Sequence, residues 1–183
     1  TSRFTALNFE LPSLYLLNKF SDFDQDGNKE LIATKLSDKG AFQKLALFEF
    51  QAGEFQEIPI SSHVAIPRDI GDADGDGLLE ILAGAGPASF IYGSEKPGEF
   101  PTTIVWADTN DCWASRFADL DQDGKVEIIA RVGNVWTIQE NVGNHRYVLR
   151  DSLPNPTSGT NGTGVPHTEV GDFDNDHKME IPM

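Results

Sequence analysis

Four short acidic segments hold the residues of this sequence that could do chemistry. Each has Asp at positions 1, 3 and 5 and Glu at position 9, followed directly by apolar residues. We call them loops 1 to 4: residues 22–30 (DFDQDGNKE), 72–80 (DADGDGLLE), 119–127 (DLDQDGKVE) and 172–180 (DFDNDHKME). Alternate side chains of a tightly turned segment converge on one point, and hard cations such as calcium prefer six to eight oxygen ligands. The pattern therefore predicts up to four Ca²⁺ sites.

The spacing assigns the same set of expected ligands to every loop. We expect the carboxylates of positions 1, 3, 5 and 9 to bind the ion, together with the backbone carbonyl of position 7. These residues are Asp22, Asp24, Asp26, Asn28 and Glu30; Asp72, Asp74, Asp76, Leu78 and Glu80; Asp119, Asp121, Asp123, Lys125 and Glu127; and Asp172, Asp174, Asp176, Lys178 and Glu180. Gly at position 6 permits a sharp turn with positive φ in loops 1 to 3.

Loop 4 departs from this pattern at two places. His177 replaces the Gly of position 6, and a side chain makes positive φ less favourable. Pro182 follows Glu180 closely and cannot donate a hydrogen bond to a neighbouring strand. Loop 4 is therefore expected to bind Ca²⁺ more weakly than the others or to remain empty.

An EF-hand is the main alternative for such loops, and position 12 excludes it. An EF-hand needs a bidentate Glu at position 12 and helices on both sides. The four residues at position 12 are Ala33, Ala83, Ala130 and Met183. None of them can bind a cation, and β-favouring residues follow each loop.

The elements around the loops are predicted to be strands. The first Asp of each loop lies at 22, 72, 119 and 172, a period that suits a four-stranded unit with short connections. Apolar runs separated by Gly, Pro, Asn and Asp predict strands at 13–20, 30–36, 44–51 and 54–60; 63–70, 79–83, 89–92 and 102–106; and 113–118, 126–132, 135–140 and 145–150. No segment sustains a helical period, so the chain is predicted to be all-β.

The repeated D-x-D-x-D-G-x-x-E pattern resembles the FG-GAP or VCBS repeats of integrin-α-type β-propellers, whose calcium loops read D-x-D-x-D-G-x-x-D/E. Residues 84–87 (GAGP) are similar to the Gly-Ala-Pro element of that family. The resemblance implies a β-propeller of four-stranded blades. It also implies that each calcium loop joins the first two strands of a blade on one face of the propeller.

On this basis we expect about three and a half blades from a larger propeller. Residues 1–12 would end a preceding blade through a strand at 4–10, and 13–61, 62–107 and 108–153 would be complete blades. Residues 154–183 would begin another blade after the loop-forming stretch 154–164.

Composition argues against a basic or nucleic-acid partner, a disulfide-bonded protein and a membrane-spanning helix. The net charge is −15, but 16 of the 29 acidic side chains lie in the four loops, and the other 13 face 14 Lys and Arg. Bound cations would neutralise the excess locally, so no basic partner is indicated and nucleic acid is disfavoured. The single cysteine, Cys112, excludes an internal disulfide. No apolar run is long enough for a membrane helix, and the N-terminus lacks the features of a signal peptide.

The remaining reactive or aromatic residues have ordinary structural explanations. His63, His145, His167 and His177 share no metal-ligand spacing, and Cys112 has no neighbouring base. Trp106, Trp113 and Trp136 are expected in the core, with a sugar-binding face as the alternative. Residues 161–163 (NGT) match an N-glycosylation acceptor.

Together these observations favour a calcium-stabilised scaffold for protein or glycan recognition or adhesion. We expect the protein to be extracellular, at the cell surface or periplasmic, because weak calcium-binding modules need the millimolar calcium found outside the cytosol. Each ion would relieve repulsion among the carboxylates and stabilise a hairpin. Catalysis would need an open coordination position and a nearby acid or base, which the pattern does not show, so no catalytic residue is assigned. Alternatives are the propeller of a secreted polysaccharide lyase, with His63, His145, His167 and Arg131 as loose candidates, a lectin, or a structural subunit of a surface or membrane-associated complex.

Overall fold

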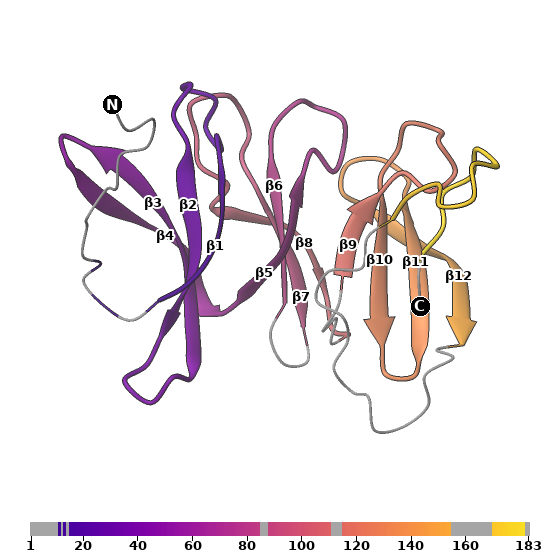
Figure 1. The fold of residues 1–183 in the computed structure, drawn as a ribbon, viewed down its shortest axis with the longest axis horizontal. Helices are drawn as coiled ribbons and strands as arrows, with labels where there is room; N and C mark the ends of the chain where they lie inside the picture. The colour runs from indigo at the N-terminus through magenta and orange to yellow at the C-terminus, as the bar shows by residue number, and fades with distance from the viewer. Residues whose placement is uncertain are drawn as a thin grey trace, which may run out of the picture.

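The computed structural model describes residues 11, 13, 15–84, 88–110, 115–154 and 170–181, and these form an all-β structure. Twelve strands make three four-stranded antiparallel sheets, in which consecutive strands are neighbours (Figure 1). No helix long and apolar enough to cross a membrane occurs among these residues. The predicted all-β class and the four-stranded units are thus confirmed.

The strand boundaries follow the predicted ones within a few residues. The first sheet contains β1 (Tyr15–Ser21), β2 (Glu30–Leu36), β3 (Phe42–Gln51) and β4 (Glu54–Val64). The second contains β5 (Ile66–Gly71), β6 (Glu80–Gly84), β7 (Ser89–Gly93) and β8 (Thr103–Asp108). The third contains β9 (Ser115–Ala118), β10 (Glu127–Val132), β11 (Val135–Asn141) and β12 (Tyr147–Pro154). The strand predicted at 4–10 lies outside the described residues.

The strands after loops 1 to 3 are buried on both faces, and in β6 and β10 successive side chains alternate between two neighbouring layers. In β6, Ile81 packs into the cluster shared with the first sheet, whereas Leu82 packs into the cluster shared with the third sheet. In β10, Ile128 faces the second sheet and Ile129 faces the opposite side. Burial on both faces explains why these strands read as unbroken apolar runs.

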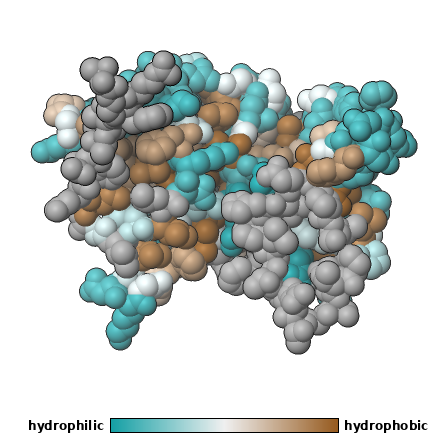
Figure 2. All heavy atoms as spheres, in the orientation of Figure 1, coloured by the Kyte–Doolittle hydropathy of each residue, from teal (hydrophilic) through white to brown (hydrophobic). Residues whose placement is uncertain are grey.

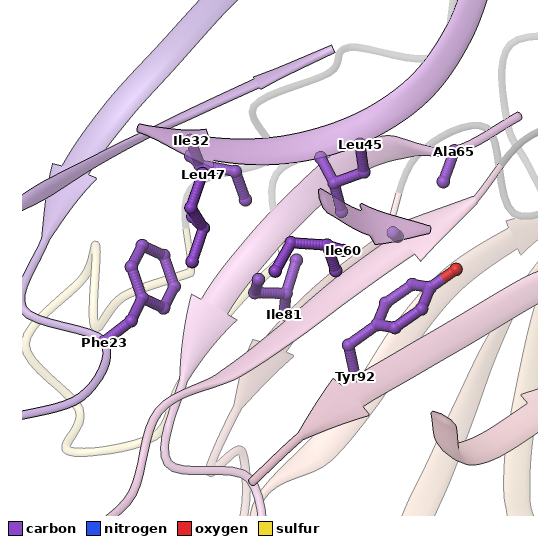
Figure 3. Close-up of a cluster of buried hydrophobic side chains, with 9 residues drawn as sticks. Phe23, Ile32, Leu45, Leu47, Ile60, Ala65, Ile81 and Tyr92 are labelled. Carbon is purple, nitrogen blue, oxygen red and sulfur yellow. The ribbon is translucent and has the colours of Figure 1, made fainter. Parts of the chain in front are cut away.

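The largest core cluster lies between the first and second sheets. Ile32, Leu45, Leu47 and Ile60 from the first sheet meet Ile81 and Tyr92 from the second, and Phe23 of loop 1 joins them (Figure 3). Each fully buried aliphatic side chain of this kind contributes about 1.5–3 kcal/mol relative to exposure. This cluster holds loop 1 against the interface of the two sheets.

Loop 4 is packed on the free face of the third sheet. Val170 and Ile181, which flank the loop, lie against Ile129 and the buried Trp136. Gly171 and Glu180 form an isolated antiparallel bridge. The last described segment therefore sits where a fourth layer would begin. Trp136 takes the predicted core position, and Trp106 packs on Tyr147, with ring centroids 5.5 Å apart. Trp113 lies outside the described residues.

Candidate metal centres

Loops 1, 2 and 3 each connect the first two strands of a sheet. Loop 4 is closed by the same pairing of its flanking residues as the other three loops. The residue before position 1 pairs with the Glu of position 9 in every copy: Ser21 with Glu30, Gly71 with Glu80, Ala118 with Glu127, and Gly171 with Glu180. All four loops lie along the upper edge of the molecule in Figure 1. In the same orientation, Figure 2 shows hydrophilic surface gathered at the right-hand end of this edge.

Four internal hydrogen bonds recur in all four loops. In one of them, Oδ1 of the position-3 Asp accepts a bond from the N–H of position 5 at 3.0–3.3 Å. The Glu of position 9 accepts a bond from the N–H of position 2, at 2.8 Å in loop 1, 2.6 Å in loop 2, and 2.7 Å in loops 3 and 4. Oδ2 of the position-1 Asp accepts a bond from the N–H of position 6 at 3.0–3.1 Å. Oδ1 of the position-5 Asp accepts a bond from the N–H of position 7 at 2.7–2.9 Å. The expected ligands are thus held in one orientation from loop to loop.

Two residues in each loop adopt positive φ, and the sequence pattern indicated only one of them. At position 6, φ is 93°, 89° and 84° for the three glycines and 69° for His177. Position 4 has positive φ as well, at Gln25, Gly75, Gln122 and Asn175. The backbone of loop 4 therefore makes the same turn as the other three, at the cost of holding a histidine in a conformation that favours glycine.

The turns bring most of the predicted carboxylates together. Potential ligand atoms lie within 4.8 Å of one another in five groups. These are Asp22, Asp24 and Glu30; Asp72, Asp74 and Asp76; Asp74, Glu80 and His145; Asp119, Asp121 and Glu127; and Asp172, Asp174, Asp176 and Glu180.

Asp26 and Asp123 stand outside the groups of their own loops, and in both residues a neighbour engages the two carboxylate oxygens. The amide of Asn28 donates to Asp26 Oδ2 at 2.9 Å, and Lys125 Nζ donates to Asp123 Oδ2 at 2.7 Å. Lys178 binds Asp176 in the same way at 2.7 Å. The residues at position 7 donate their N–H groups to position 5, and the role of their carbonyl oxygens stays a prediction.

The Glu side chains of loops 1 to 3 are buried without a cationic partner among the described residues. Glu30, Glu80 and Glu127 are 0%, 1% and 3% exposed. In loops 1 and 3 the second oxygen of Glu30 and of Glu127 (Oε1) is buried with no hydrogen-bond partner, and so is Oδ1 of Asp22 and of Asp119. Buried charges without a compensating group are costly, so these oxygens need a counter-charge.

Burial also disfavours the charged form of these carboxyl groups. Desolvation raises the pKa of Glu30 to about 7, helped by Asp24 and Asp22 and opposed by the N–H of Phe23. Desolvation raises the pKa of Glu80 to about 8 in the same manner. The pKa of Glu127 is raised as well, again chiefly by burial. A bound divalent cation would reverse this preference, because it supplies the positive charge that the fold lacks at these points.

The donor set fits a hard cation. It consists of carboxylate oxygens on a turned backbone, with orphaned buried oxygens in loops 1 and 3, and calcium prefers such ligands. Loop 4 is more open to solvent than loop 1. Phe173 at position 2 is 59% exposed, whereas the corresponding Phe23 is fully buried, and Glu180 is only partly buried. Pro182, the second predicted obstacle in loop 4, lies outside the described residues.

Neighbouring loops are joined through positions 4 and 6. Gln25 donates from its side-chain amide to the carbonyl of Gly77, and Gln122 donates to the carbonyl of His177 at 3.1 Å. Loop 1 is thereby tied to loop 2, and loop 3 to loop 4. Loop 2 has Gly75 at position 4, and instead of such a bond a cavity of about 180 Å³ lies between loops 2 and 3.

The histidines and the arginine considered for catalysis make separate contacts. His63 Nε2 lies 2.9 Å from the hydroxyl of the buried Tyr92, and Arg131 donates to the carbonyl of Gly133. His145 differs, because its Nε2 lies 3.1 Å from Asp74 Oδ2, a contact that the sequence did not indicate. Cys112, His167, the predicted glycosylation acceptor at 161–163 and residues 85–87 of the GAGP stretch lie outside the described residues.

Comparison with known families agrees with the loop geometry. Residues 72–130, which contain loops 2 and 3 and strands β6 to β8 of the second sheet, match the family model described as FG-GAP-like repeat. This segment is similar to an FG-GAP-like repeat. The predicted FG-GAP resemblance is thereby confirmed for the part of the chain that it covers. No curated protein and no solved structure gave a significant match to the chain.

Proposed function

We propose that the chain belongs to a calcium-binding β-propeller whose acidic loops brace one edge of the sheet stack, and that it serves as a scaffold for recognition of a protein or glycan. The buried carboxylate oxygens of loops 1 and 3 carry the proposal. Asp22, Glu30, Asp119 and Glu127 each leave one buried oxygen without a partner, although the fold provides hydrogen bonds for their other oxygens. A divalent cation is the simplest group that would satisfy these oxygens and their charge together.

Three further observations support the propeller and its setting. The three sheets stack as antiparallel meanders of four strands, which is the form of propeller blades. Three of the four strands of the second sheet, β6 to β8, lie within the segment that matches the FG-GAP-like repeat. Calcium sites built on a few loop carboxylates suit the millimolar calcium of an extracellular, cell-surface or periplasmic setting.

The loop geometry points to a structural role for the ions. Loops 1 to 3 are each the corner of a hairpin, and hydrogen bonds join loop 1 to loop 2 and loop 3 to loop 4, so an ion in one loop of such a pair would also stabilise its partner. Recognition would then occur on surfaces that the braced edge holds in place.

Calorimetric titration of chelator-stripped protein with CaCl₂ tests the proposal. We expect Ca²⁺ binding together with a rise in the melting temperature on calcium addition, because a ligand that binds only the folded state stabilises it. Glu127→Gln should remove binding at loop 3, and Glu54→Gln, the same change at an exposed position on β4, should not alter it. Heat of binding absent from the wild type, with a melting temperature indifferent to calcium, would refute the proposal.

A further inference from the structure

Loop 2 differs from the other loops by an imidazole that reaches it from the next sheet. His145 lies in the turn between β11 and β12 of the third sheet, and its Nε2 is 3.1 Å from Asp74 Oδ2. Potential ligand atoms of Asp74, Glu80 and His145 all lie within 4.8 Å of one another. In the described part of the chain, the corresponding groups of loops 1, 3 and 4 contain only carboxylates.

The turn that carries His145 is fixed on loop 2 from both sides. Asn141 Nδ2 donates to the carbonyl of Ala73 at 2.8 Å, and the hydroxyl of Tyr147 donates to the same carbonyl at 3.3 Å. Asn141 is itself buried, with 3% exposure. Asn144 and His145 both adopt positive φ, at 50° and 51°. The imidazole is therefore held in place by contacts of the residues on either side of it.

The protein groups around this cluster leave it incompletely satisfied. Glu80 is 1% exposed, and its Oε2 accepts a hydrogen bond from the N–H of Ala73. Nδ1 of His145 is buried and has no hydrogen-bond partner among the described residues. The cavity of about 180 Å³ between loops 2 and 3 is lined by Asp74, one of the three residues of the cluster.

We propose that Asp74, Glu80 and His145 form a site for a divalent transition-metal ion of the zinc type, which joins the second and third sheets. Imidazole with two carboxylates is a donor set that suits zinc, whereas calcium prefers oxygen ligands throughout. Three protein ligands leave a coordination position that water can fill from the cavity. The inference rests on the proposed function, since it assigns to one of the four cation loops a different ion from the other three.

Calorimetric titration of chelator-stripped protein with ZnCl₂ tests the site, with His145→Asn as the decisive variant. Asn tolerates positive φ, so this substitution removes the imidazole while keeping the turn. We expect the Zn²⁺ affinity of the variant to fall by at least ~10-fold, the lower end of what even the partners of metal ligands contribute. His145→Gly, which also fits the turn, should show the same loss. His63→Gln, which alters a histidine outside the cluster, should leave Zn²⁺ binding unchanged.

A parallel titration with CaCl₂ separates this inference from the proposed function. Zn²⁺ binding that depends on His145, in a protein that binds no Ca²⁺, would support the zinc-type site and refute the calcium scaffold. Ca²⁺ binding with a Zn²⁺ affinity that neither His145 variant changes would overturn the zinc-type site alone, leaving His145 as a simple ion-pair partner of Asp74. Visible absorption of the Co²⁺-loaded protein should likewise change in His145→Asn, because coordination geometry and ligand type determine this spectrum.

Discussion

Glu30 allows the electrostatic argument to be tested without measuring any ligand. Its carboxyl group is fully buried at the end of loop 1, and burial raises its pKa from 4.5 to about 7. Glu30→Gln keeps a side-chain oxygen that can accept the hydrogen bond from the N–H of Phe23, but it cannot ionise. In metal-free protein this variant should therefore be more stable than the wild type at pH 8.

The sign and size follow from proton linkage. Between pH 4.5 and about 7 the folded state retains a proton at Glu30 that the unfolded state has lost, so the free energy of unfolding falls as pH rises. The difference between the two pKa values corresponds to about 3 kcal/mol, fully present as a penalty above pH 7 and absent below pH 4.5. In excess calcium the order should reverse at pH 8, because the variant has lost a ligand.

Urea denaturation of metal-free wild type and Glu30→Gln at pH 4.5, 6 and 8 gives the required free energies. The two curves should approach each other at pH 4.5 and separate toward pH 8, and Glu54→Gln should follow the wild type throughout. Parallel pH dependence of wild type and Glu30→Gln would show that Glu30 is not the buried, uncompensated acid described above.

Four further substitutions probe single features of the loops. Gly124→Ala should destabilise the protein by about 1 kcal/mol in urea denaturation, because φ is +84° with open space around it, and His177→Gly should stabilise it by a similar amount. Lys125→Met should raise the Ca²⁺ affinity of loop 3 in calorimetry at low salt, since Nζ then no longer competes for Asp123; an affinity equal to that of the wild type would contradict this. Gln122→Ala should cost about 0.5–1.5 kcal/mol and speed hydrogen exchange in loop 4, where unchanged exchange would argue against the link between loops.

The strands and the carboxylate positions could be predicted because their signals are local. The run Glu30–Leu36 was predicted as a strand and is one, since a buried central strand needs unbroken apolar residues after the turn. The Asp spacing likewise located groups that the turns bring within reach of one ion. Gln25 and Gln122 gave no comparable signal, because glutamine has no special preference for the positive φ that both adopt.

Contacts between sheets could not be predicted from local patterns. His145 looked like an ordinary turn histidine, and only the stacking of the third sheet on the second brings it to Asp74. The burial of Glu30, Glu80 and Glu127 was hidden for the same reason, because each lies beside a polar loop in sequence and under a neighbouring sheet in space. A single sequence specifies these contacts only through the packing of whole layers.

The alternation of side chains in β6 affects how this protein unfolds. Ile81 belongs to one interface and Leu82 to the next, so the second sheet is coupled to its two neighbours through separate sets of atoms. Such an array behaves as a chain of nearest-neighbour couplings, in which damage to one layer weakens the adjacent interface first and fades with distance along the stack. An ion lost from one loop would then soften a region about two layers wide, while the remaining layers keep their order.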